Sequence, residues 1–425
     1  MKDLTPGLKF SRRSLMMLSA SVVGGALIKT ASDAIKVEHS NGIIPEKVVF
    51  DPTKVLGAGP STLGKRAPNE QLQRYVVDAS PSGNSRSPLQ DMVGMITPSD
   101  LHFERHHGGV PQIAPEDYEL LIHGMVERPL KFSLNDLKRF PQHSKICFIE
   151  CSGNGSKSYH KTAESETMSP QALDGLVSTS EWTGVRLSTL FREAGIQSAA
   201  KWFLAEGSDA AVLSRSIPVE KAWDDALVAY AQNGEAIRPE QGYPVRLLLP
   251  GWEGNTHVKW LRRMEIADRP FMTREETSKY TDPLPDCTAR LFSFVMDAKS
   301  LITFPAFPYI LPDKGWWEIK GLAWSGRGKI TKVEVSTDTG RHWHPAELAE
   351  PVLSKCQTSF RFLWKWNGGE TTLMSRATDE TGYIQPTFGQ LVKVRGKGTA
   401  YHYNHIRAWK ILKDGQVRLG LNEMI

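Results

Sequence analysis

Aromatic and polar residues alternate in the last third of the chain, and this alternation predicts a sheet. In the segment Phe360–Trp366 the four aromatic rings stand at every second position, so one face of a strand would carry all of them. The glycine-rich turn formers of residues 367–369 follow directly. Similar strands that end in turns are predicted at Val333–Ser336 and Thr372–Ala377. The pattern predicts a β-sandwich of the immunoglobulin-like type over residues 286–410.

A different pattern covers residues 91–285. Short apolar runs alternate with helical stretches at Ser133–Phe140 and Ser188–Gly195, which is typical of a mixed α+β domain. The run Val245–Leu249, closed by Pro250 and Gly251, predicts a buried strand that enters a turn.

The two ends of the chain lack such patterns. Residues 35–90 are rich in Pro, Gly, Ser and Asn, which predicts an extended arm with one short helix near residues 70–77. Residues 411–425 are expected to form a C-terminal tail.

Residues 1–34 have the layout of an export signal. The pair Arg12-Arg13 precedes the weakly apolar run Leu15–Ile28, which is shorter than the roughly 20 residues that span a bilayer. We predict a twin-arginine signal, export to the periplasm and no membrane span. Because this route carries folded proteins, it points to a cofactor acquired in the cytoplasm. The alternative is a frayed N-terminal helix.

Composition and charge narrow the class of protein. Of 425 residues, 40% are hydrophobic and 23% are charged, which is ordinary for globular domains and excludes a polytopic membrane protein. The formal net charge is +5, but residues 1–34 hold five of the basic residues and only two of the acidic ones. The near-neutral remainder has no basic block, so we expect no nucleic-acid partner.

The four cysteines are too few for a disulfide framework. None lies in a Cys-x-x-Cys-His motif, so no covalently attached haem is predicted in this chain, and an electron acceptor would be another protein. Cys151 ends an apolar run and is followed by the small residues Ser152-Gly153-Asn154-Gly155. A thiolate in such a turn can bind a soft metal, but taken alone this residue is better interpreted as a buried structural cysteine, because a lone buried cysteine is more often a small hydrophobic residue than a ligand.

The turn Cys151–Asn154 resembles the cysteine turn of the sulfite oxidase family of molybdenum enzymes. Other segments resemble motifs of this family in the same chain order: Phe103–His107, Trp182–Leu187, Gly242–Arg246 and His257–Trp260. The resemblance implies an α+β molybdopterin-binding domain at 91–285 and an immunoglobulin-like dimerisation domain at 286–410. Gly94–Pro98, Met272–Thr281 and Gly321–Gly328 are most similar to its Sox-type sulfane and sulfite dehydrogenase branch.

The resemblance also implies roles for single residues. Cys151 would ligate molybdenum, and Arg105 would bind an anionic substrate because a guanidinium suits oxyanion oxygens. Tyr280 would match the active-site tyrosine, and Arg395 is a candidate for a second substrate arginine. The residues implied in binding the pterin cofactor are His107, Asp209, Arg246, His257 and Lys259.

Two departures from the family pattern stand out. Gly155 and Ser156 occupy the positions where eukaryotic members carry paired arginines, so the anion pocket would be built differently. Gln241 replaces a histidine, which affects one pterin contact.

The implied function is a molybdopterin-dependent, two-electron oxidation of sulfite or of sulfane sulfur on a carrier protein. A separate c-type cytochrome subunit would accept the electrons, in a homodimer or a mixed tetramer. The alternatives are an enzyme like the family's protein-methionine-sulfoxide reductases, which lack the sandwich, a nitrate reductase, and a non-catalytic scaffold or binding subunit.

Overall fold

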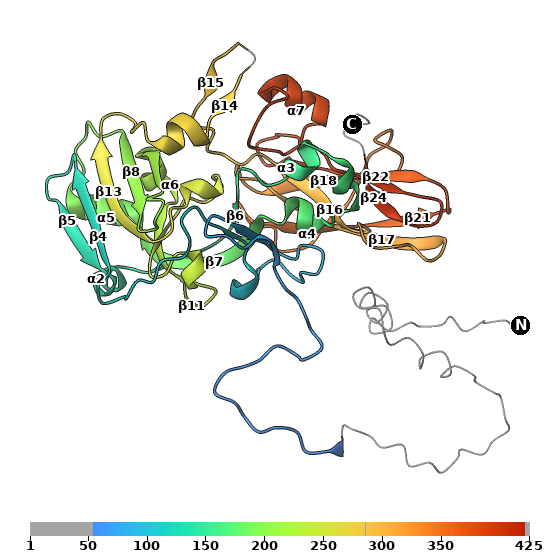
Figure 1. Ribbon diagram of the computed structural model, residues 1–425, viewed down its shortest axis with the longest axis horizontal. Helices are drawn as coiled ribbons and strands as arrows, with labels where there is room; N and C mark the ends of the chain where they lie inside the picture. Colours follow the sequence, from blue (N-terminus) through green and yellow to red (C-terminus); the bar gives the residue numbers. More distant parts are fainter. Residues whose placement is uncertain (1–53, 285, 421–425) are drawn as a thin grey trace, which may run out of the picture. The chain divides into compact units, whose positions relative to one another are not determined.

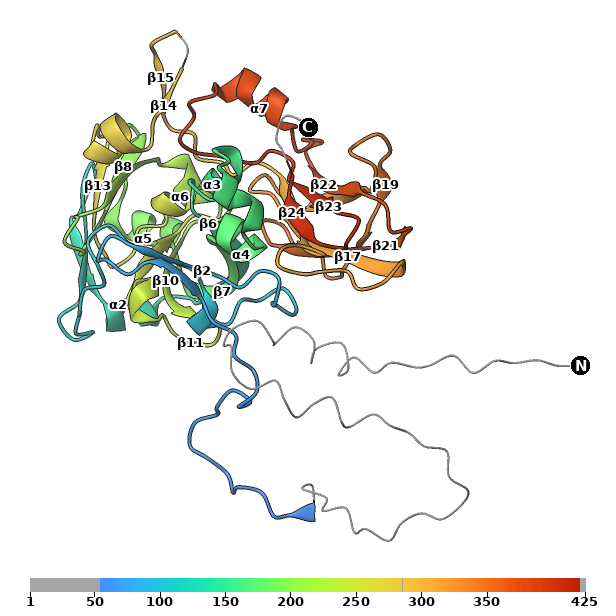
Figure 2. The ribbon, with the colours of Figure 1, turned by 45° about the vertical axis from the view of Figure 1, so that its right-hand side comes forward.

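The computed structural model describes residues 54–284 and 286–420, and from Leu72 onward these residues form one compact unit. Figures 1 and 2 show this unit from two sides. The predicted export signal, the arm up to residue 53 and the end of the predicted tail lie outside the described residues. No helix among the described residues is long and apolar enough to cross a membrane.

The C-terminal end of the arm differs from its prediction. Instead of a helix near residues 70–77, the chain forms strand β1 (Tyr75–Asp78), which pairs with β2 (Asn84–Arg86) and through it with β3 (Glu104–Arg105). Aromatic and β-branched residues in β1 favour a strand where a partner strand is available, and that partner is invisible in the local sequence. Because β3 contains Arg105, this small sheet supports a candidate site residue.

The first domain contains two five-stranded sheets. One has the order β11-β10-β7-β6, with β12 paired to β10, and every pairing in it is antiparallel. Its strands are β6 (His143–Glu150), β7 (Val177–Arg186), β10 (Leu227–Gln232), β11 (Glu235–Ala236) and β12 (Arg246–Leu248). β12 confirms the predicted buried strand. β6 ends at Glu150, so the sheet edge fixes where the cysteine turn begins.

The second sheet has the order β5-β4-β13-β8-β9, with β4 and β13 parallel. Its strands are β4 (Glu119–Gly124), β5 (Leu130–Ser133), β8 (Trp202–Gly207), β9 (Ser214–Pro218) and β13 (Leu261–Ala267). The longer helices of this domain are α2 (Leu134–Arg139), α5 (Leu187–Ala194) and α6 (Glu220–Asp224). The two predicted helices are confirmed: Ser133 caps α2, and Gly195 ends α5 in the left-handed region, at φ +68°.

The second domain is a sandwich of a four-stranded and a five-stranded sheet. Their orders are β16-β17-β21-β20 and β19-β18-β22-β23-β24. The strands are β16 (Lys299–Phe304), β17 (Gly315–Trp324), β18 (Ile330–Ser336), β19 (His344–Pro345), β20 (Glu347–Leu348), β21 (Thr358–Trp366), β22 (Thr371–Asp379), β23 (Ala408–Ile411) and β24 (Val417–Leu419). The predicted strands are confirmed, and the rings of β21 pack into the sandwich core.

The sandwich ends later than predicted. β24, which we placed in a tail, pairs with β23, and its residues Val417 and Leu419 are buried in the core. Two apolar residues separated by one polar residue were too short a pattern to predict this strand.

Short elements connect the sheets. They are η2 (Ser99–Leu101), α3 (Ser156–Tyr159), η3 (Ala163–Thr167), α4 (Pro170–Asp174), η4 (Pro239–Gln241), η5 (Gly254–Thr256), the π-helical turn η6 (Glu275–Lys279), the pair β14 (Asp282–Pro283) and β15 (Ala289–Arg290), and α7 (Phe388–Arg395). Helix α3 directly follows the cysteine turn, η3 and α4 come next along the chain, and α4 packs on β16 of the sandwich (Figure 1). The cysteine turn therefore lies next to the second domain.

Candidate functional site

A cavity opens beyond the end of β6, with about 650 Å³ of empty space including its mouth. Its wall combines five distant parts of the first domain: residues 102–107, 149–151, 209–213 and 241–260, and Tyr280. Eight predicted site residues line it: Cys151, Arg105, Tyr280, His107, Asp209, Arg246, His257 and Lys259. The fold thus brings together side chains that lie up to 175 positions apart, from Arg105 to Tyr280.

Cys151 lies in the wall of this cavity, in a turn with defined backbone contacts. Its N–H donates to the carbonyl of Leu176 at 3.0 Å, and its carbonyl accepts from the N–H of Asn154 at 2.9 Å. Burial raises the pKa of the thiol, whereas the backbone N–H of Gly153 and the charge of Arg105 act in the opposite direction. A bound metal ion would lower the pKa of the thiol further, because a coordinating thiol is held deprotonated.

Tyr280 and His107 form a hydrogen-bonded pair. The hydroxyl oxygen of Tyr280 lies 3.0 Å from Nε2 of His107. Burial raises the pKa of Tyr280 well above its ordinary value and lowers that of His107 to about 4. At neutral pH the phenol therefore keeps its proton and the imidazole is uncharged. Tyr280 donates to His107 when the ring proton of the histidine is on Nδ1.

Arg215 was missed by sequence reasoning and fixes the position of Tyr280. Its guanidinium lies 4.9 Å from the centre of the tyrosine ring. It also pairs with Glu276 at 2.7 Å and Glu253 at 3.3 Å, and the arginine side chain is 1% exposed. Because Glu276 belongs to the turn just before Tyr280, the ion pair fixes the whole segment.

Two cations, Arg246 and Lys259, also line the cavity. Arg246 is buried and donates to the carbonyls of Gln241 and His257 at 2.9 and 3.1 Å, and no carboxylate pairs with it among the described residues. Burial lowers its pKa to about 9. Burial, and then the charge of Arg246, lower the pKa of Lys259 to about 7. Two cations that repel each other without a carboxylate partner are suited to an anionic ligand.

Two further wall residues, His257 and Asp209, lie near these cations. His257 accepts from the N–H of Leu249 at 3.3 Å and has Nε2 at 3.2 Å from the carbonyl of Trp252, so both ring nitrogens are engaged by the backbone. Burial lowers its pKa to about 3, and the ring is neutral. Asp209 accepts from the N–H of Leu213 at 3.0 Å.

Arg395 is the predicted site residue that the structure does not bring to the cavity. It ends α7 and is buried against Asp282, with the charged atoms 3.2 Å apart, and lies 3.7 Å from Asp297. Since carboxylates already neutralise its charge, we leave it out of the site. Outside the cavity wall, Tyr401 packs against Tyr280, with the two ring centres 5.2 Å apart.

The wall contains buried polar atoms without a protein partner. They are Nε2 of His102, Nε of Arg246 and Oδ1 of Asn255. His102 and Asn255 were not predicted, because no residue pattern distinguishes them from structural polar residues. Buried polar groups normally find partners, so these atoms, the unpaired cations and the thiol fit a polar, anionic, metal-carrying ligand such as molybdopterin.

Comparison with known families agrees with this reading. The family described as the oxidoreductase molybdopterin binding domain matches residues 107–275, and the Mo-co oxidoreductase dimerisation domain matches residues 291–408. The fold and the cavity thus define a molybdopterin oxidoreductase: a cofactor-binding domain followed by an immunoglobulin-like dimerisation domain, as the resemblance implied.

The particular family follows from a solved structure. A chain in the crystal structure of the sulfane dehydrogenase SoxCD from Paracoccus pantotrophus is 41% identical, with a TM-score of 0.81, and the match covers 88% of this chain and 99% of that chain. The protein belongs to the sulfite oxidase family of molybdenum enzymes.

Two curated relatives are longer than this chain. The mitochondrial sulfite oxidase of Drosophila melanogaster is 32% identical over 369 residues, which are 79% of this chain and 64% of that protein. A nitrate reductase [NADH] of Ulva prolifera is 30% identical over 355 residues, which are 71% of this chain and 39% of that protein. This family implies a molybdenum–molybdopterin cofactor.

Proposed function

We propose that this protein oxidises reduced sulfur, either sulfite or sulfane sulfur on a carrier protein, and passes two electrons to a c-type cytochrome. One observation carries the proposal: the thiol of Cys151, the guanidinium of Arg105 and the Tyr280–His107 pair line the same cavity as the unpaired cations Arg246 and Lys259. The similarity to a sulfane dehydrogenase over nearly the whole of that chain supports the sulfur substrate.

The proposed roles follow from the positions of the side chains. When bound, molybdopterin would supply the two-electron redox chemistry at molybdenum. Cys151 would hold the metal, while Arg246 and Lys259 would hold the anionic end of the cofactor. Asp209, His257 and Gln241 line the same part of the wall, and the side chain of Asp209 already accepts a hydrogen bond from the N–H of Leu213.

The protein groups near the thiol would act on the substrate. Arg105 would attract and orient a sulfur oxyanion, since a fixed guanidinium binds oxygen pairs. When the ring proton of His107 is on Nε2, the histidine would donate to Tyr280 and leave the phenol O–H free to donate to the substrate, and Arg215 would hold the tyrosine ring in place. Because the attraction is electrostatic, we expect KM for sulfite to rise with ionic strength.

The cellular setting belongs to the same proposal. The twin-arginine layout of residues 12–13 supports export to the periplasm with the cofactor already bound. The resemblance to the dehydrogenase branch supports a cytochrome partner, and the dimerisation domain supports a homodimer or a mixed tetramer.

The first experiment measures molybdenum by mass spectrometry on the matured protein, and then sulfite-dependent reduction of cytochrome c. We expect stoichiometric molybdenum and its loss in Cys151→Ser, while Cys287→Ser, which changes an exposed cysteine, keeps the metal. Fully active Cys151→Ser would refute the proposal, as would matured protein without molybdenum, the result expected of a scaffold. If the protein reduced nitrate and did not oxidise sulfur compounds, it would instead be assigned as a nitrate reductase, the other activity found among the relatives.

A further inference from the structure

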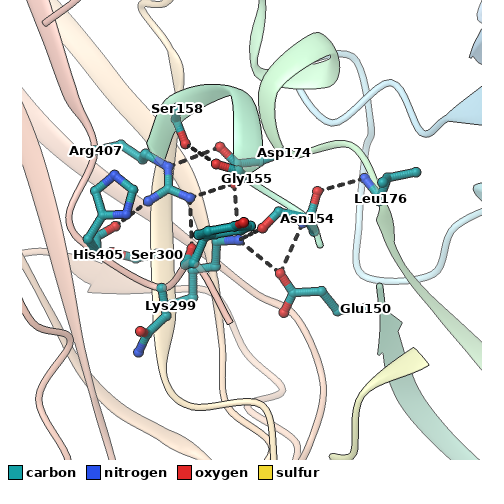
Figure 3. Close-up of polar contacts among 12 residues, drawn as sticks. Glu150, Asn154, Gly155, Ser158, Asp174, Leu176, Lys299, Ser300, His405 and Arg407 are labelled. Carbon is teal, nitrogen blue, oxygen red and sulfur yellow. Dashed lines mark hydrogen bonds and ion pairs between the residues drawn. The ribbon is translucent and has the colours of Figure 1, made fainter. Parts of the chain in front are cut away.

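Four buried charges join the two domains directly behind the cysteine turn (Figure 3). The first domain supplies two carboxylates, Glu150 at the end of β6 and Asp174 at the end of α4. The sandwich supplies two cations, Lys299 at the start of β16 and Arg407 just before β23. None of these side chains is more than 3% exposed.

The ion pairs form a connected network. Nζ of Lys299 lies 2.9 Å from Oε1 of Glu150 and 3.0 Å from Oδ1 of Asp174. Arg407 donates to both oxygens of Asp174, at 2.9 and 3.2 Å. The charges of Lys299 and Arg407 hold the pKa of Asp174 far below its ordinary value. Two anions therefore face two cations, and the network is balanced as long as all four are present.

This network reaches the backbone on both sides of the candidate metal ligand. Glu150 directly precedes Cys151, and Lys299 also donates to the carbonyl of Asn154 at 3.3 Å. The side chain of Asn154 donates to Oε1 of Glu150 at 2.9 Å and accepts from the N–H of Leu176 at 3.0 Å. One ammonium group of the sandwich thus connects the two ends of the turn from residue 150 to residue 154.

The turn is also held by close packing. Gly155 has a φ of +93°, and a Cβ atom there would collide with the guanidinium of Arg407 and come within 2.8 Å of Oδ1 of Asp174. The cations lie so close to the backbone that the turn has no room to move toward the sandwich.

We propose that Lys299 and Arg407 are positioning residues that hold the Cys151 turn in the geometry in which its thiolate binds molybdenum. The inference deepens the proposed function and rests on it for the role of the thiol. It assigns a part of the metal site to the sandwich domain, in addition to dimerisation.

The test compares Lys299→Met with a matched control. Lys355→Met removes another cross-domain lysine, whose Nζ lies 2.6 Å from Asp225. Among the described residues, its side chain forms ion pairs with Asp224 and Asp225 and not with residues 150–155. Both variants lose one cation between the domains, but only Lys299→Met loosens the cysteine turn. The double variant Glu150→Gln/Lys299→Met removes a matched pair of charges and keeps the network neutral, so it tests the same contact if the single variant does not fold.

Two readouts are independent of turnover. The first is the alkylation rate of Cys151 in cofactor-free protein, followed by peptide mapping. We expect about a tenfold increase in Lys299→Met, because the loosened turn exposes the buried thiol to the reagent more often. The second is the molybdenum and pterin content of matured protein, which we expect to fall because loss of a residue that supports a metal ligand weakens metal binding about 10- to 100-fold.

The outcomes separate the inference from the function on which it rests. Faster alkylation and lower molybdenum in Lys299→Met, with Lys355→Met unchanged, support the inference. The inference is overturned if Lys299→Met has the same alkylation rate and the same molybdenum content as the wild type. The double variant is compared with the wild type in the same way. If wild-type protein matures without molybdenum while the alkylation contrast remains, the proposed function fails and the sandwich is still shown to hold the turn.

Discussion

Lys259 gives a prediction that can be worked out from the structure. Burial and the nearby Arg246 lower its pKa from 10.5 to about 7. In the unfolded chain the lysine keeps its ordinary pKa, so between pH 7 and about 10 the unfolded state binds more protons than the folded state. The unfolding free energy of cofactor-free protein therefore rises with pH in this window through Lys259. Below pH 7 the full cost of the buried charge is present.

The size of the effect follows from the shift. A displacement of three to four units corresponds to at most about 5 kcal/mol, and the slope cannot exceed about 1.4 kcal/mol per pH unit for one proton. The side chain of Lys259 is only partly buried. Because a partly hydrated site has a higher effective dielectric constant, we expect a change in the unfolding free energy of about 2 kcal/mol, less than half of this limit.

The assay is urea denaturation of cofactor-free wild type and Lys259→Met between pH 7 and 9.5, followed by tryptophan fluorescence. The methionine variant also loses hydrogen bonds to the carbonyls of Arg105 and Glu240, but this loss shifts its whole curve and not its slope. We expect the advantage of the variant over the wild type to shrink as pH rises. Lys355→Met is the control, because its pKa is raised by Asp225 and the lysine stays charged throughout. Parallel curves for wild type and Lys259→Met would refute the reasoning.

Three further predictions concern residues around the cavity. Arg215→Met leaves two buried carboxylates without their cation, so urea denaturation should show a loss of about 3–5 kcal/mol; a variant as stable as the wild type would contradict the ion-pair assignment. The ring of His107 should titrate near pH 4 in an NMR experiment on cofactor-free protein, and a midpoint near its ordinary pKa would mean that the ring is hydrated. Gly155→Ala should lower the unfolding free energy by about 1–3 kcal/mol, because φ is +93° and the new Cβ meets Arg407. Gly153→Ala, where a Cβ meets open space, is its control, and equal losses in the two variants would show that the contact is unimportant.

Local patterns predicted the elements whose cause is local. The alternating rings of 360–366 required one buried face, and the structure buries them between the two sheets of the sandwich. Gly195 marked the end of α5 because it adopts a positive φ there. The candidate site was predicted by the order of several motifs, since Cys151 taken alone favours a structural cysteine.

The sequence did not predict features that depend on distant partners. β1 exists because β2 is available to pair with it, and Arg395 lies away from the cavity because Asp282 and Asp297 neutralise it. Arg215 could not be selected from the sequence, since its function depends on carboxylates 38 and 61 positions away.

The composition of the cysteine turn explains why it needs support from another domain. Ser152, Gly153 and Gly155 are small, which lets a cofactor approach the backbone closely but leaves few side-chain atoms that could pack and hold the turn. Rigidity must then come from hydrogen bonds and charges, and the groups that supply them here, Lys299 and Arg407, belong to the sandwich. Since these bonds are buried, they are strong when complete and costly when one partner is missing. A turn of this composition and the sandwich behind it therefore form one functional unit, and the metal site should be sensitive to substitutions in either domain.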